Sequence, residues 1–296
     1  MSSTLGTVQI LFLALALVMV GLGLSLEIED FRRIGRDRRQ VAVGMALQFL
    51  AMPALAFVIV SAFNVSPPYA VGLFLLAAAP GSISASIYSR IFGGNVALNM
   101  SLTGINTMLS MVTLPLICGW AQGHYLQGAT DAVSPVGKLA EAMVTLSIPA
   151  AVGMAIRAKA PAFAARADKP MRVISLLVLV AFSVGAILKE WASLLTGFAE
   201  VGGAVIAFNL AALGAGYALA RTVLVPQGAL AVAFELGVRS AVLSIYLAIT
   251  TLHDSRIALP AAVYSITMVV FAMTFGALMR RRGTEALSKS PASASA

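Results

Sequence analysis

The chain of 296 residues has few of the side chains that build disulfides, metal centres and soluble active sites. It contains a single cysteine, Cys118, and two histidines, His124 and His253, which fall in segments expected to be loops. One cysteine excludes an internal disulfide, and with two histidines no metal cluster can be assembled. The His-Glu-x-x-His and Gly-x-Ser-x-Gly motifs are also absent, so metalloproteases and serine hydrolases of those types are disfavoured.

Charge is scarce as well. Only 11% of the residues are charged and 59% are hydrophobic, which gives a mean hydropathy of +0.93, whereas soluble domains carry about 25% charged residues. This balance indicates an all-α polytopic membrane protein, in which each crossing helix needs about 20 apolar residues. About nine transmembrane helices are expected, near residues 5–26, 41–63, 68–89, 95–120, 137–158, 171–189, 195–220, 227–252 and 257–279.

The basic residues lie mostly on one side of this layout. The net charge is +8, and sixteen of the 20 Lys and Arg residues fall in alternate connections between the expected spans. The positive-inside rule then places the amino terminus outside and the carboxyl terminus in the cytoplasm, with the protein in the inner (plasma) membrane. Topology thus explains the charge, and a nucleic-acid partner is not expected.

Long soluble segments are missing too. Because the connections are short, we expect one membrane domain over residues 1–283, followed by a disordered tail over 284–296 in which Ser and Ala predominate. The membrane bundle must itself carry the function. No cofactor is expected beyond a coupling ion, and the expected partners are the lipid bilayer and a small solute.

Against this background, Glu235 and Arg239 stand inside the apolar stretch 229–249. A charge at the centre of a bilayer costs about 2.5–3.5 kcal/mol on insertion scales, and such residues usually mark ion or substrate pathways. The spacing predicts that the two side chains pair if the helix resumes after Gly237. We interpret these two residues as the centre of the functional site.

Two of the expected spans carry similar interruptions. One begins at Pro67 and contains Ala-Pro-Gly-Ser at 79–82, and the other begins at Pro226 and contains Glu-Leu-Gly-Val at 235–238. Proline removes a backbone donor and glycine relaxes the backbone, so both spans are predicted to be broken helices. Interruptions at corresponding positions of two halves point to the midplane site of a transporter. Simple kinks are the alternative.

The span near 95–120 carries a polar stripe. Its members recur at helical spacing on one face and are Asn95, Asn99, Thr103, Asn106 and Ser110. This face cannot point at lipid, so it lines a hydrated or ion-binding cavity or serves as hydrogen-bonding contact between helices. Gln48, in the middle of the span near 41–63, is a further buried amide.

Several ordered motifs, at residues 19–26, 48–53, 79–82, 94–98 and 235–238, together resemble the bile acid:sodium symporter family over nearly the whole chain. The resemblance implies a nine-helix, bacterial-type member with inverted repeats and two broken helices that cross at mid-membrane. It also implies a panel domain built from the spans near 5–26, 137–158 and 171–189. The remaining six spans would form a core domain.

The same resemblance implies two sets of cation ligands, made of the oxygen atoms that suit a hard ion. The first sodium ion would lie among Ser86, Asn99, Thr103 and Glu235. The second would lie near Gln48 and the backbone carbonyls of Glu235, Leu236 and Val238.

The chain departs from the family's pattern beside the second set. Arg239 and Ser240 stand where the family usually has glutamine and asparagine. Because a guanidinium stays charged at any accessible pH, we predict that Arg239 replaces the second sodium ion. The alternative is that Arg239 binds an anionic substrate, with Ser240 and Asn106 as further contacts.

The preferred interpretation is a secondary active transporter that moves a small organic anion by alternating access between core and panel. Half-helix amino termini and Arg239 would attract the anion. The coupled ion is sodium, as the resemblance implies, or a proton carried by Glu235, or there is none. A passive channel and an intramembrane enzyme with Glu235 as general base are the rival functions, and enzymatic activity is not expected.

Overall fold

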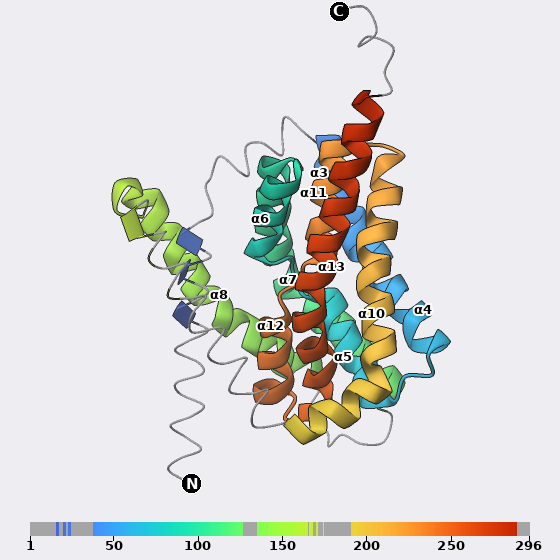
Figure 1. Cartoon of the computed structure of the whole chain (residues 1–296). Helices are drawn as coiled ribbons and strands as arrows, with labels where there is room; N and C mark the ends of the chain where they lie inside the picture. The colour runs from blue at the N-terminus through green and yellow to red at the C-terminus, as the bar shows by residue number, and fades with distance from the viewer. Residues whose placement is uncertain are drawn as a thin grey trace, which may run out of the picture.

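The computed structural model describes residues 38–126, 135–164 and 191–288, together with isolated positions within 16–24 and 166–174. Within these ranges the chain is helical, and its extended pairing is limited to an isolated bridge between Gly81 and Arg239. The helices form an elongated bundle (Figure 1). The predicted spans near 5–26 and 171–189 lie outside the described residues apart from the isolated positions, so the count of nine spans stays a prediction.

The first half of the bundle contains three segments in the order continuous, broken, continuous. The first comprises α3 (Arg38–Ala46), the π-helix η1 (Leu47–Ala51) and α4 (Met52–Ala62). The broken segment is formed by α5 (Pro67–Ala78) and α6 (Ile83–Phe92), and the third is α7 (Val96–Tyr125).

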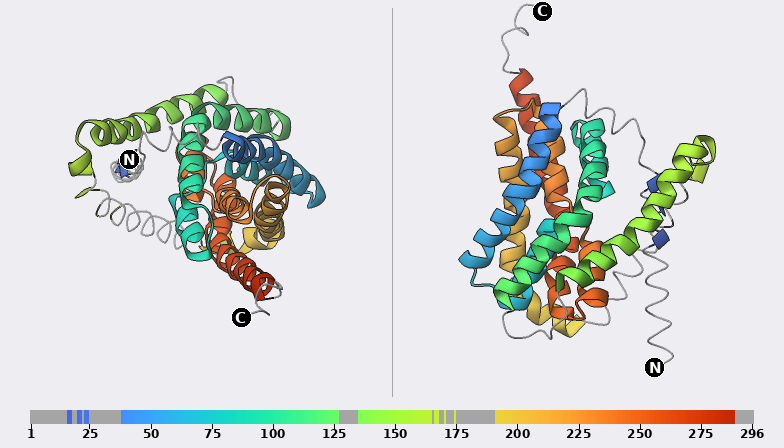
Figure 2. Two further views of the ribbon diagram at one scale, coloured as in Figure 1. Left: turned by 90° about the horizontal axis from the view of Figure 1, so that it is seen from above. Right: turned by 180° about the vertical axis from the view of Figure 1, so that it is seen from behind.

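The second half repeats this order. It consists of α10 (Trp191–Arg221), then α11 (Pro226–Gly237), α12 (Ala241–Tyr246) and the π-helix η2 (Leu247–Thr251), then α13 (Ser255–Ser288). Helix α13 therefore includes the start of the segment 284–296 for which disorder was expected, and residues 289–296 lie outside the described part. Helix α8 (Pro135–Lys159) connects the halves in the chain, contacts α7 and η2, and lies at the edge of the bundle (Figure 2).

Within the residues that the structure describes, three helical segments are long and apolar enough to cross a membrane, at residues 38–62, 197–221 and 255–281. Helix α7 adds a fourth if its two parts, Val96–Ser110 and Val112–Tyr125, are one span bent by 58°. Pro115 accounts for the bend, because proline lacks an N–H and its ring crowds the carbonyl four residues earlier. The described part of the chain is therefore helical, and its apolar spans are those of a polytopic membrane protein.

Both interruptions predicted from the sequence are present. Helix α5 ends before Ala79, which is extended with ψ of 147° because the following Pro80 disfavours the helical conformation. Helix α6 restarts after Ser82, whose side chain accepts a hydrogen bond from the Ser84 N–H. Helix α11 ends at Gly237, and α12 begins only at Ala241.

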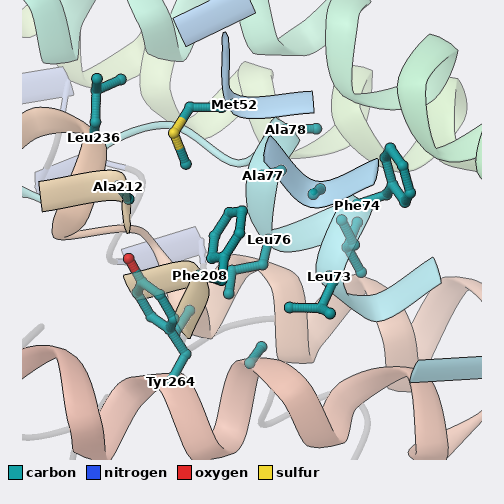
Figure 3. Packing of buried hydrophobic residues seen from close by; sticks show 14 of the residues in the cluster. Met52, Leu73, Phe74, Leu76, Ala77, Ala78, Phe208, Ala212, Leu236 and Tyr264 are labelled. Atoms are coloured by element: carbon teal, nitrogen blue, oxygen red, sulfur yellow. The ribbon is translucent and has the colours of Figure 1, made fainter. Parts of the chain in front are cut away.

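The first parts of both broken segments are enclosed by other helices. All residues from 70 to 78 in α5 and from 228 to 237 in α11 are buried. Helix α5 packs against α4, α7 and α13, whereas α11 packs against α10, α6 and α7. In the core, Tyr264 of α13 projects towards Phe208 and Ala212 of α10, close to Leu236 of α11 (Figure 3). The packing thus holds the irregular backbone of the two breaks inside the bundle.

The ends of the helices separate the basic residues. The amino-terminal end of α3 and the carboxyl-terminal ends of α6, α10 and α13 gather at one end of the bundle (Figures 1 and 2). These ends carry Arg38, Arg90, Arg221 and Arg280, whereas α13 starts at the other end and has Arg256 in its first turn. In the described helices, basic residues therefore gather at one end of the bundle.

Candidate functional site

The two helix breaks lie against each other. An isolated antiparallel bridge joins Gly81 to Arg239. The Ser82 N–H donates to the Val238 carbonyl at 2.8 Å, and the Ser240 N–H donates to the Pro80 carbonyl at 3.0 Å. Each break therefore satisfies backbone groups of the other, which allows non-helical chain to exist in a place shielded from water and lipid.

Glu235 lies in the last turn of α11 and is 2% exposed. The hydroxyl of Thr103 donates to its Oε2 atom at 2.6 Å, and Asn106 Nδ2 donates to its Oε1 atom at 3.3 Å. Gly81 approaches the same carboxylate closely, because a Cβ atom at position 81 would lie 2.2 Å from its Oε1 atom. The two donors come from α7, and Gly81 belongs to the chain just before α6.

Two amide oxygens near this carboxylate lack hydrogen-bond partners. Asn99 donates through Nδ2 to the Ala231 carbonyl at 2.9 Å, but its Oδ1 atom is buried and unpartnered. The Oδ1 atom of Asn106 is also buried and unpartnered. Buried polar atoms are nearly always hydrogen-bonded, so these two oxygens have the capacity to accept a further partner.

The predicted polar stripe of α7 serves three purposes. Asn95 caps the helix by accepting from the Leu98 N–H at 3.0 Å, and Ser110 donates to the Thr107 carbonyl of its own helix at 2.7 Å. Between them, Asn99, Thr103 and Asn106 face α11 through the bonds described above. The middle of the stripe is therefore the part that belongs to the site.

Arg239 lies in the break between α11 and α12 and is 0% exposed. Its Nη1 atom donates to Gln48 Oε1, and its Nη2 atom donates to the Ala77 carbonyl, both at 2.5 Å. Gln48 belongs to the π-helix η1 and also donates to the Ala77 carbonyl at 3.4 Å. The guanidinium thus connects the second break to the carboxyl end of α5 and to the preceding span.

The structure corrects the expectation that Glu235 and Arg239 pair directly. Their side chains bind different partners, Glu235 towards α7 and Arg239 towards η1 and α5. The reason is local, because residues 238–240 are not helical and the regular four-residue spacing does not apply.

A model of the Sodium Bile acid symporter family matches residues 12–195, which is more than half of the chain. The chain belongs to this family. The match confirms the resemblance inferred from the ordered motifs, and it places α3 to α8 inside the matched region. Glu235 and Arg239 lie beyond it.

Relatives cover more of the chain. The probable sodium/metabolite cotransporter BASS2 of rice chloroplasts (Oryza sativa subsp. japonica) is 28% identical over 262 residues, or 88% of this chain and 61% of that protein. The uncharacterized sodium-dependent transporter YocS of Bacillus subtilis is 26% identical over 81% of this chain and 73% of its own length. The human ileal sodium/bile acid cotransporter is 28% identical over 79% of this chain and 68% of its own length. The chain therefore spans about three fifths of the length of the rice relative.

The remaining residues suggested by the family resemblance lie at or near the two helix breaks, in different environments. Ser86 is half-buried and donates to the Ile83 carbonyl of its own helix at 2.7 Å. Leu236 packs in the hydrophobic core, and the Val238 carbonyl accepts from Ser82. Ser240 is half-buried and contributes its N–H to the pairing of the breaks.

Two residues at the site were not identified from the sequence. Tyr264 of α13 donates its hydroxyl to the Gly237 carbonyl at 2.8 Å, and Asn209 of α10 donates Nδ2 to the same carbonyl at 3.5 Å. They donate to a carbonyl at the carboxyl end of α11, just as Gln48 and Arg239 donate to a carbonyl at the carboxyl end of α5. Asn209 could have been recognised in the sequence, because it is a lone asparagine within the apolar span near 195–220.

Proposed function

We propose that this protein is a secondary active transporter that couples the movement of a small organic anion to sodium. The observation that carries the proposal is the buried Glu235 carboxylate, which lies with two unpartnered amide oxygens where two broken helices meet. In transporters built from broken helices, coupling cations bind at such interruptions. Membership of a symporter family favours transport over the rival function of an intramembrane enzyme.

The side chains around Glu235 can accommodate a sodium ion by rotating about their own bonds. The Thr103 hydroxyl can turn from donor to acceptor, and a half-turn of the Asn106 amide brings Oδ1 to the position of Nδ2. With Asn99 Oδ1 these atoms form an oxygen set around one negative charge, which suits a hard cation. Ser86 would join this set only after leaving the Ile83 carbonyl.

The anion is proposed to bind near the amino-terminal end of α6, where the helix dipole is positive. Helix α6 starts inside the bundle at the crossing, with Ser82 and Ser84 half-buried beside the other break. Relatives carry names of sodium/metabolite and sodium/bile acid cotransporters. These names and the half-helix support an organic anion as the substrate class.

We assign alternating access to movement between a core and a panel. The core would contain the two sets of three spans, and α8, at the edge of the bundle, would belong to the panel with the spans near 5–26 and 171–189. The repeated order continuous, broken, continuous supports inverted repeats. So does the placement of Gln48 and Asn209, each a buried amide that donates to a carbonyl at the end of the following half-helix.

The proposed setting is a plasma membrane, with the amino terminus outside and the carboxyl terminus in the cytoplasm. The arginine-bearing ends of α3, α6, α10 and α13 would face the cytoplasm, since basic residues are retained on that side. Glu235 would then lie near the middle of the membrane.

The decisive experiment measures thermal melting of the purified full-length protein while sodium replaces potassium at constant ionic strength. A cation that binds the folded state stabilises it by mass action, by about 2.7 kcal/mol at a hundred times its Kd. We expect sodium to raise the melting temperature of the wild type but not that of Glu235→Gln. Ser110→Ala is the control, because Ser110 is buried on α7, the helix of Thr103 and Asn106, but donates to the Thr107 carbonyl of that helix and not to Glu235.

Counterflow of labelled organic anions in proteoliposomes then tests transport itself. Glu235→Gln should fold, with the same elution profile as the wild type, and should lose or uncouple transport. Wild-type transport rates and unchanged ion dependence in Glu235→Gln would refute the assignment. A response to pH without a response to sodium would assign Glu235 to a proton.

A further inference from the structure

Arg239 holds a fixed positive charge inside the bundle at the end of a half-helix. Its terminal nitrogens donate to Gln48 Oε1 and to the carbonyl of Ala77, which lies in the last turn of α5. The last carbonyls of a helix lack partners within the helix and carry partial negative charge. The guanidinium therefore neutralises the negative end of α5.

The oxygen atoms that bind this guanidinium are of the kind that a mobile cation would use. Carboxyl ends of half-helices and carbonyls at helix breaks coordinate coupling cations in transporters of this architecture. Gln48 adds an amide oxygen from a π-helical turn, a local distortion that is frequent at functional sites. In this chain the guanidinium of Arg239, from the other broken helix, occupies the position between these oxygen atoms.

We propose that Arg239 is a tethered cation that occupies a second cation-binding position, so that the transport cycle carries one mobile sodium ion. The inference rests on the proposed role of Glu235 but concerns a different pocket. Because the guanidinium remains charged at accessible pH, it fills the position throughout the cycle. It also repels a second cation at short range.

The contacts of Arg239 argue against a direct salt bridge to the substrate. Both terminal nitrogens already have protein acceptors, and the side chain is fully buried. Only the Nε atom lacks a partner. A substrate carboxylate would have to displace Gln48 and Ala77 together, which would leave the end of α5 uncompensated. Full burial likewise excludes an arginine that extends to the membrane surface.

A consequence concerns the charge moved in each cycle. A monovalent anion accompanied by one sodium ion carries no net charge, whereas a second sodium ion would make the same cycle electrogenic. The tethered cation replaces the electrostatic contribution of that second ion without being transported. Cooperativity between sodium ions is therefore absent in the wild type.

The test is the binding of radioactive sodium to the purified full-length protein, with potassium as the replacement cation. The compared proteins are the wild type, Arg239→Gln, Arg239→Lys and Glu235→Gln. We expect Arg239→Gln to bind one more sodium ion per chain than the wild type, with a Hill coefficient above one. Arg239→Lys should match the wild type, because it keeps the charge.

The difference between Arg239→Gln and the wild type decides the inference. An equal sodium stoichiometry in these two proteins would overturn it, as would two cooperative sodium ions in the wild type. The proposed function is judged separately, by whether the wild type binds sodium and Glu235→Gln loses it. If Arg239→Gln does not elute as a folded species, the wild type decides alone, with one ion supporting the tethered cation and two refuting it.

Discussion

Gly81 and Glu235, on the two different broken helices, approach each other so closely that a Cβ atom at position 81 would overlap the carboxylate. The amino-terminal end of α6 and the negative charge of α11 are therefore in direct contact. Glycine is needed at this position because a side chain would collide with the carboxylate.

Gly81→Ala should displace the Glu235 carboxylate and weaken sodium binding by at least about tenfold, which corresponds to about 1.4 kcal/mol. The measurement is the sodium dependence of the melting temperature. Gly214→Ala is a suitable control, since nothing lies within 4 Å of a Cβ at that helical position. Its sodium response should be unchanged. An unaltered response in Gly81→Ala would show that the close approach does not matter for the ion.

Thr103→Val removes the hydroxyl that donates to Glu235 while it keeps the volume of the side chain. We expect a loss of about 1–3 kcal/mol in the interaction that holds the carboxylate, seen as a reduced affinity for sodium in direct binding measurements. Thr107→Val provides the control, because Thr107 is buried one turn away and bonds only to the Thr103 carbonyl. Equal affinities in the two variants would contradict the placement of Thr103 in the ion site.

Tyr264→Phe should destabilise the bundle by about 1–3 kcal/mol, since it leaves the buried carbonyl of Gly237 without its shorter hydrogen bond. Thermal melting without sodium measures this effect. Tyr125→Phe removes a buried hydroxyl that has no hydrogen-bond partner, so this variant should be neutral or slightly stabilised. A smaller loss in Tyr264→Phe than in Tyr125→Phe would refute the capping role.

The orientation of the chain can be tested with single cysteines. Cys118 is fully buried, and Cys118→Ala gives a background without thiols. In that background a cysteine introduced at Ser3 should react with a membrane-impermeant reagent added outside, and one at Ser290 should react only after the cytoplasmic face is opened. Labelling of position 3 only from the cytoplasm would refute the proposed topology.

Local chemistry was sufficient to predict both broken helices. Pro80 constrains Ala79 to an extended conformation, and Gly237 ends α11. The spacing of Asn99, Thr103 and Asn106 likewise predicted one face of α7. These features depend on backbone preferences and helical periodicity, which act over a few residues and can be recognised in a single chain.

The contacts that these side chains make across the two helix breaks could not be predicted in this way. The four-residue spacing suggested a pair between Glu235 and Arg239, but this expectation assumed a helix that the structure replaces with the bridge between the breaks. Likewise, the sequence contains no signal that Tyr264 would reach the Gly237 carbonyl. Such contacts join residues far apart in the chain, and they depend on how the helices pack.

The sequence by itself determined that the chain is an apolar helical protein with two interruptions and a charged residue pair among them. Only the tertiary structure decided which end of which half-helix each charge would meet. Glu235 meets the amino-terminal side of α6, and Arg239 meets the carboxyl-terminal end of α5. The physical reason is that a buried charge needs nearby compensation, and here the two ends of one broken helix provide it in opposite signs.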